Sequence, residues 1–184
     1  LPLRLIGALG FRRGVQIIKG ALAGLKAPQL SLAGTSYFSA LPIALGPFAV
    51  QYAFAARDKA ATIALARDTL GEDLAVRLRT SPVVYDFQLR FYVDPSSTPI
   101  EDASVEWKSP WINVGTLTLP VQDPDSTRAL QVRSTVEDLS FDPWHARTDM
   151  RPLGNIMRGR NVAYRTSTKA RDAKPEPRSM PAFQ

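Results

Sequence analysis

The chain has 184 residues, of which 45% are hydrophobic and 22% are charged, and its formal net charge is +6. This composition is that of a globular protein long enough to bury a core. The absence of cysteine excludes disulfides and thiolate metal sites, and the single histidine excludes a metal centre built from several histidines of this chain. The basic residues are scattered and accompany no stacking-aromatic module, so nucleic-acid binding is not predicted.

The first segment, residues 1–34, is predicted to contain an amphipathic helix over 14–25. We expect this helix to pack on the protein's own core, with binding to a membrane surface or a partner as the alternative. No apolar run reaches about 18 residues, so no membrane span is predicted. Because the chain starts with Leu1 rather than Met, we expect a processed product, a fragment or part of a longer chain. The apolar positions recur at near-helical spacing, at Ile17, Ile18, Leu22 and Leu25.

The next two segments, residues 35–55 and 57–79, have different sequence patterns. Residues 35–55 mix aromatic residues with Pro and Gly, which favours turns joining short extended pieces. Residues 57–79 are predicted to form one or two helices, with Gly71 near a possible break. Their apolar stripe repeats every four residues, at Leu70, Leu74 and Leu78.

Two strands are predicted in the middle of the chain. Residues 83–94 alternate apolar and polar side chains over twelve positions, as in a half-buried strand. Residues 112–121 form a second strand whose apolar phase shifts at Gly115, which indicates a bulge. We expect the two to be antiparallel neighbours in a curved sheet. Two further short strands are predicted at 130–132 and 136–139.

The last forty residues carry the most informative pattern. A helix capped by Asn155 would place Arg160, Tyr164 and Arg171 within roughly 20° of one another on one face. Adjacent positive charge favours the deprotonated phenolate, and a phenolate with an arginine one turn away is the kind of ligand that ferric haem takes in catalase. Residues 172–184 are predicted to be an irregular tail.

The motif order upstream of this helix strengthens that comparison. Leu-Ser-Phe-Asp-Pro-Trp-His at 139–145 and Arg-Pro-Leu-Gly at 151–154 precede the tyrosine helix, and 99–107 and 117–120 fit the same pattern. The sequence resembles the catalase-related haem proteins from about residue 37 to 178, although catalase proper has Asp where Thr166 stands. The resemblance implies an α+β fold in which residues 35–171 are the C-terminal half of a catalase-type antiparallel β-barrel, with flanking helices and a C-terminal proximal haem helix.

The resemblance also implies haem as cofactor and a role for each of four residues. Tyr164 would supply the phenolate to iron, and Arg160 would donate a hydrogen bond to that phenolate. Arg171 would face a haem propionate, which suits a guanidinium fork. Phe141 would line the proximal side of the porphyrin. His145 is not expected to contact the cofactor or to do acid–base work.

Two functions follow as hypotheses. The first is a catalase-like haem protein acting on hydrogen peroxide or organic hydroperoxides. The family's distal histidine and asparagine lie upstream of anything in this chain, so another chain or an N-terminal half must supply them. The second is a catalase-derived structural subunit, because a half-barrel exposes strand edges that need a partner. Either predicts an oligomer or larger complex, in the cytoplasm or an organelle. One acidic cluster is interpreted as a structural turn rather than a hydrolase site, at Glu101, Asp102 and Glu106.

Overall fold

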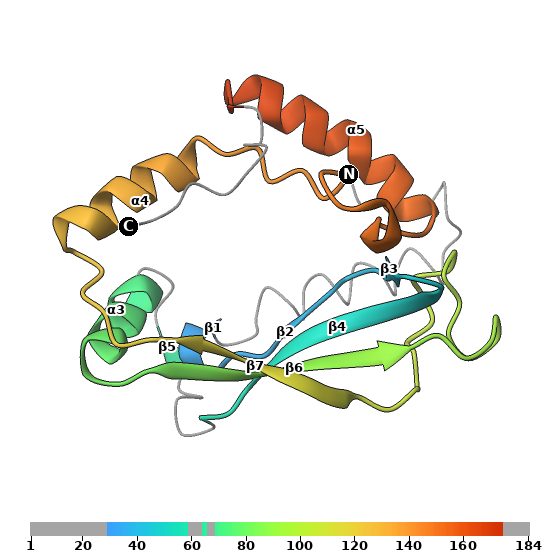
Figure 1. Cartoon of the computed structure of the whole chain (residues 1–184), viewed down its shortest axis with the longest axis horizontal. Helices are drawn as coiled ribbons and strands as arrows, with labels where there is room; N and C mark the ends of the chain where they lie inside the picture. The colour runs from blue at the N-terminus through green and yellow to red at the C-terminus, as the bar shows by residue number, and fades with distance from the viewer. Residues whose placement is uncertain (1–28, 59–63, 66–68, 175–184) are drawn as a thin grey trace, which may run out of the picture.

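The computed structural model describes residues 29–58, 64–65 and 69–174. These residues form a twisted antiparallel sheet with the helices α4 and α5 arching over one side of it and α3 at one end (Figure 1). The fold is thus α+β, as expected. The helix predicted over 14–25 lies outside the described residues.

The elements have the following bounds. The five-stranded sheet has the order β2-β4-β6-β7, with β3 paired to β4, and consists of β2 (Tyr37–Phe38), β3 (Ile43–Leu45), β4 (Phe48–Ala56), β6 (Val83–Phe91) and β7 (Ile112–Leu119). A separate two-stranded sheet joins β1 (Gln29–Leu30) and β5 (Ala64–Leu65). The helices are α3 (Leu70–Thr80), α4 (Thr127–Glu137) and α5 (Asn155–Ala170), with 3₁₀ turns at Leu32–Gly34 and Thr148–Met150.

The pairing of β6 with β7 confirms the predicted antiparallel neighbours. Their register runs from Val83 opposite Leu119 to Leu89 opposite Ile112, and it shifts after Phe87. Since Phe87 pairs with Gly115 and the next residue pairs with Asn113, the irregularity lies beside the glycine that the sequence singled out. The strand pairing continues on both sides of this shift.

Among the described residues the sheet is not closed into a barrel, so the predicted barrel part of the fold is not confirmed. Within the described residues, β2 and β7 stand at the two ends of the strand order and each pairs with one neighbour. No strand in the part of the chain that the structure describes pairs with the outer edge of β7.

The segment before α3 is more extended than predicted. β4 is a nine-residue strand that continues through Ala56, and Ala64–Leu65 are also extended, so the helix expected over 57–79 begins only at Leu70. Gly71 does not break that helix, because it lies in the first turn, where backbone N–H groups have no intrahelical partner. The predicted apolar stripe is confirmed: Leu78 is buried and Leu74 packs on the core.

The two short strands predicted at 130–132 and 136–139 are wrong, because this segment is the helix α4. The Ser126 hydroxyl caps it by accepting a hydrogen bond from the backbone N of Ala129 at 3.3 Å. Val132 and Val136 are four residues apart and border one hollow beside Leu78, which is helical rather than strand spacing. The cap at Ser126 favours a helix here, although the β-branched side chains of this segment favour a strand.

The core lies between α3, the first 3₁₀ turn and the sheet. Its buried members are Ala33, Leu78, Val83 and Tyr85, and Phe54 packs against them. Burying such side chains stabilises the fold by about 1.5–3 kcal/mol each for the larger ones. This core holds one end of β4 and β6, and Tyr52 in the middle of β4 faces the pocket described below.

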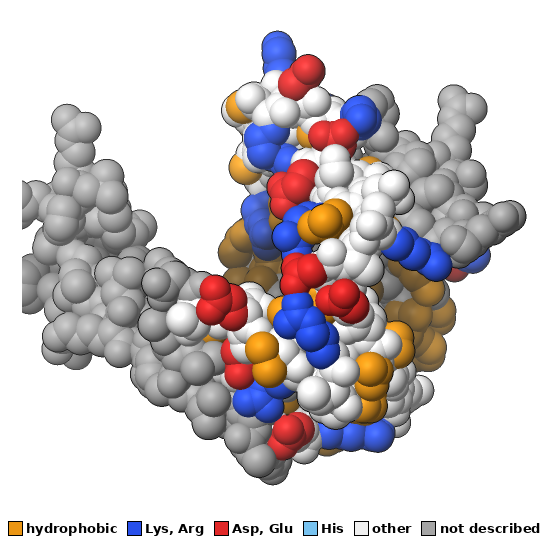
Figure 2. All heavy atoms as spheres, turned by 90° about the vertical axis from the view of Figure 1, so that its left-hand side faces the viewer, with side chains coloured by type: hydrophobic (Ala, Val, Ile, Leu, Met, Phe, Trp, Pro, Cys, Tyr) orange, Lys and Arg blue, Asp and Glu red, His pale blue; other side chains and the backbone are white. Residues whose placement is uncertain are grey.

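The surface at the end formed by α3 and α4 carries interspersed charges of both signs (Figure 2). Arg79 of α3 forms ion pairs with Asp123 and Asp125, which hold the β7–α4 connection to the helix. This face is therefore not a patch of a single charge. Over the residues that the structure describes, no helix combines the length and the apolar character needed to cross a membrane.

Candidate haem site

The helix α5 brings two of the predicted site residues into contact. Arg160 lies one turn before Tyr164, and its Nη2 donates a hydrogen bond to the Tyr164 hydroxyl at 2.7 Å. The guanidinium carbon lies 5.3 Å from the centre of the tyrosine ring. The Tyr164 oxygen thus accepts a hydrogen bond from a cation. A metal ligand likewise directs a lone pair of its oxygen toward a cation.

This pair lies at the wall of a pocket of about 480 Å³ between α5 and the sheet. The sheet side contributes Phe38 and Tyr52, and the helix contributes Met157 beside Arg160 and Tyr164. Most of the lining residues are apolar or aromatic, and Arg160 is the charged residue among them. A pocket of this kind suits a flat apolar group with one polar anchor.

Backbone hydrogen bonds to β3 hold residues 149–153, the segment before α5, against the sheet. The N–H of Ala44 donates to the carbonyl of Arg151 at 2.9 Å, and the N–H of Leu153 donates to the carbonyl of Pro42 at 3.0 Å. Residues 149–153 thus lie along the free side of β3 like a short extra strand. The Arg-Pro-Leu-Gly motif is therefore the segment that docks α5 onto the sheet.

The start of α5 falls where the sequence predicts it, but Asn155 is not its cap. Asn155 is the first helical residue, and the cap position is Gly154, whose φ of +89° favours glycine. The missing cap is supplied from far away in sequence: the Glu101 carboxylate accepts a hydrogen bond from the backbone N of Asn155 at 2.7 Å. The interpretation of Glu101 as part of a structural turn thus understates what it does.

The other two predicted site residues are not brought to the pocket. Arg171 is the exposed C-cap residue of α5 and does not line the pocket. Phe141 is 55% exposed, has a φ of +52° and is likewise outside the lining. Their roles toward a propionate and a porphyrin face stay predictions. His145 is exposed in the turn where its backbone N donates to the carbonyl of Asp142 at 3.0 Å.

Sequence reasoning missed several residues of the pocket. Met157 is buried and lies seven residues before Tyr164, so helical spacing alone was enough to place it on the same face. Its sulfur lies 3.9 Å from Nη1 of Arg160. Phe38 and Tyr52 come from the sheet, and no local pattern links them to α5.

The comparisons with known proteins bear on the fold. No protein-family model and no curated protein matches the sequence. Among solved structures, the chain is similar to a structure of a bacterial catalase, with a TM-score of 0.56 and 17% sequence identity. The fold is catalase-like. The match covers 80% of this chain and 32% of that one, so the chain spans about a third of the length of that catalase.

The residues that line this pocket are compatible in their chemistry with the ligand side of a haem. They provide one phenol oxygen, one guanidinium that donates to it, and apolar and aromatic walls for a macrocycle. Among the described residues, no group of three or more His, Asp or Glu side chains is arranged to hold a metal ion.

Proposed function

We propose that this chain is part of a catalase-like haem protein that acts on hydrogen peroxide or organic hydroperoxides. The observation that carries the proposal is the hydrogen bond from Arg160 to Tyr164 at the wall of the pocket between α5 and the sheet. The catalase-like fold supports it. When bound, the haem would supply the ferric iron chemistry that breaks a peroxide O–O bond.

The chain's own residues have distinct parts in this proposal. Tyr164 binds the iron through its phenol oxygen, and Arg160 donates to that oxygen and so limits the charge that it gives to the metal. Tyr52 and Met157 keep water away from the ligand. Arg171, which lies at the end of α5 outside the pocket lining, would face a propionate that extends beyond the pocket, for which a guanidinium is a suitable partner.

The acid–base group is proposed to come from outside this pocket. Moving a proton between the two peroxide oxygens needs a positioned side chain with a suitable pKa, most often a histidine. Within the described residues the pocket has no histidine in its lining, and His145 is exposed elsewhere. We therefore propose that another segment or another chain completes the site, so the active form is an oligomer or a larger complex.

A second candidate function is that of a catalase-derived structural subunit. The observation favouring it is the open strand β7, which has no charged residue over Ile112–Leu119 and exposes Ile112, Val114 and Leu117. Proteins usually protect such an edge with charge, proline or a partner. In this reading, α5 is a docking helix and the Arg160–Tyr164 bond is a contact on its surface.

Titration of the purified protein with haemin separates the two functions. The haem-protein proposal predicts saturable binding with an intense band near the Soret region and a phenolate-to-iron charge-transfer absorption. Tyr164→Phe should remove that absorption and weaken haem retention, whereas Tyr92→Phe, the same change outside the pocket, should not. A protein that stays colourless with its partners present would leave the structural subunit as the function.

A further inference from the structure

We infer that Glu101 is a positioning residue for Tyr164, because it clamps the first turn of the helix that carries the tyrosine. This inference rests on the proposed role of Tyr164 as the haem ligand. The Glu101 Oε2 accepts hydrogen bonds from the backbone N of Asn155 at 2.7 Å and from Nη2 of Arg158 at 3.0 Å. Its Oε1 accepts a longer bond from Nη1 of Arg158 at 3.3 Å.

The loop that carries Glu101 is held by hydrogen bonds on both sides of it, and one of them comes from the sheet. Before it, the fully buried Thr98 accepts a hydrogen bond from the backbone N of Val93 at 2.8 Å through its hydroxyl. After it, the buried Trp107 donates from Nε1 to the carbonyl of Pro99 at 2.9 Å, and its own carbonyl accepts a bond from Arg90 of β6 at 2.6 Å. The carboxylate is thus presented by a preorganised loop, and its bond to α5 constrains the helix rather than the loop.

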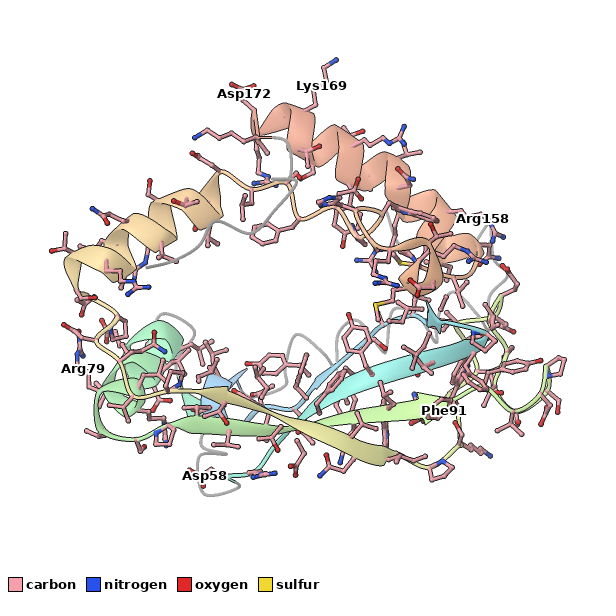
Figure 3. The ribbon with its side chains drawn as sticks, viewed as in Figure 1. Asp58, Arg79, Phe91, Arg158, Lys169 and Asp172 are labelled. Carbon is pink, nitrogen blue, oxygen red and sulfur yellow. The ribbon has the colours of Figure 1, made fainter. Side chains whose placement is uncertain are left out.

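The contact between this loop and α5 is close. A Cβ added to Gly154 would lie 2.7 Å from the carbonyl oxygen of Ile100, the residue before Glu101. Only glycine fits that approach, and its φ of +89° is also one that other residues rarely adopt. Figure 3 shows Arg158 at the end of α5 that approaches the sheet.

The position of Gly154 explains why α5 needs a second attachment besides the hydrogen bonds to β3. The hydrogen bonds between β3 and residues 149–153 hold the chain before this glycine, whose backbone is the most permissive in the segment. The bond from Asn155 to Glu101 lies on the helix side of the glycine. Glu101 therefore fixes the direction of α5, which the docking to β3 alone does not fix.

The direction of α5 decides where the Tyr164 hydroxyl lies. Tyr164 is nine residues after Asn155, which is about 14 Å along a helix axis at about 1.5 Å per residue. A tilt of about 10° at the start of α5 would move the tyrosine by about 2 Å relative to the sheet residues across the pocket. A ligand displaced by that distance no longer holds a metal in the same geometry.

The negative charge of Glu101 also strengthens its contact with the start of α5. The Arg158 guanidinium, together with the Asn155 N–H, holds the pKa of the Glu101 carboxyl below its usual range. The carboxylate is thus ionised at neutral pH and lies at the helix N-terminus, where the helix dipole favours negative charge. Its hydrogen bond to Asn155 is therefore of the stronger, charge-assisted kind.

The test measures the position of α5 directly. The chain has no cysteine, so nitroxide labels can be attached at Lys169→Cys on α5 and Thr118→Cys on β7 without other sites reacting. Both positions are exposed, and Lys169 points away from the sheet in Figure 3. Pulsed electron–electron dipolar spectroscopy then gives the distribution of distances between helix and sheet.

We expect Glu101→Ala to broaden or shift this distribution and to weaken haemin binding about tenfold. Glu101→Gln keeps an acceptor for Asn155 and should restore most of both properties, and Arg158→Gln, which removes the ion pair but leaves the cap, should change them little. Should Glu101→Ala fail to fold, Glu101→Asp replaces it, because the side chain is one methylene shorter and should give the same shift.

The outcomes separate this inference from the proposed function. An unchanged distance distribution in Glu101→Ala overturns the inference, whatever haemin does. A changed distribution with unaltered haemin affinity and phenolate absorption also overturns it, because α5 would then move without affecting Tyr164. A parent protein that binds no haemin refutes the proposed function, and with it the role assigned here to Glu101.

Discussion

The hydroxyls of Tyr37 and Tyr85 donate to the same acceptor, the backbone carbonyl of Leu32, at 3.0 and 2.8 Å. Their rings meet edge to face with centres 5.9 Å apart. Tyr85 is only 5% exposed, and burial, with Tyr37 beside it, raises its pKa to about 12. The pair joins the segment before β2 to the centre of the core.

The raised pKa of Tyr85 makes stability depend on alkaline pH. Because the folded-state pKa lies above the ordinary value of 10, this group's contribution is fully present below about pH 10 and is lost as the pH rises toward about 12. Tyr85→Phe should cost about 1 kcal/mol at pH 7, since Leu32 keeps its bond from Tyr37. The variant should also lose stability less steeply between pH 10 and 12. Urea denaturation at several pH values measures both effects, and identical slopes would contradict the assignment.

Gly154 and Gly159 form a matched pair of glycines at and inside α5. Gly154→Ala should destabilise the protein by about 1–3 kcal/mol from backbone strain, and more from the clash with Ile100. Gly159→Ala should stabilise it by about 1 kcal/mol, because Gly159 is inside the helix and a Cβ there would meet nothing within 4 Å. Thermal and urea unfolding of the two variants measure these opposite signs. A neutral Gly154→Ala would mean that the loop and α5 are not in close contact.

The edge of β7 predicts association in solution. Val114 lies in this strand and is 49% exposed, so Val114→Lys should place a charge on the open edge without disturbing the core. We expect the parent protein to sediment as more than a monomer and the variant to shift toward the monomer. Val162→Lys, which changes an exposed valine of α5, is the control and should leave the distribution unaltered. A cooperatively folded parent monomer of 20.2 kDa would contradict this prediction.

The outcome for the fold shows what local pattern can and cannot predict. Alternation predicted β6, and the phase shift at Gly115 predicted the irregularity in β7, because both signals lie within one strand. The predicted barrel part stays unconfirmed, since barrel closure depends on which strand edges meet, and no local pattern reports that. For α4, the β-branched residues favour strands, whereas the Ser126 cap favours the helix that the structure shows.

The contacts of the candidate site are also of two kinds: local contacts, which the sequence predicts, and long-range contacts, which it does not. Arg160 and Tyr164 are four residues apart in one helix, so spacing alone brought them together. Glu101 and Asn155 are 54 residues apart and meet only because the β6–β7 loop folds back over the start of α5. No periodicity reports such a contact, and the acidic residues around Glu101 gave only a turn signal.

The hydrogen bond from Arg160 predicts a change in the potential of bound haem. Arg160→Leu should keep Tyr164 as ligand, but the phenolate would then donate more charge to the iron and stabilise its ferric state. The midpoint potential should therefore fall, as measured by spectroelectrochemistry. His145→Ala should leave the potential and the spectrum unchanged, since His145 is exposed and outside the pocket. A potential that responds to His145 and not to Arg160 would reverse this assignment.

The most direct measurement of the central claim is resonance Raman spectroscopy of the haemin-loaded protein with excitation in the phenolate-to-iron charge-transfer band. The account predicts iron–phenolate and phenolate ring vibrations in the parent protein and in Tyr92→Phe, and their loss in Tyr164→Phe. It also predicts that Arg160→Leu retains these bands at a shifted iron–oxygen frequency, because the ligand stays while its hydrogen bond is removed. Phenolate vibrations that persist in Tyr164→Phe would show that another residue holds the iron.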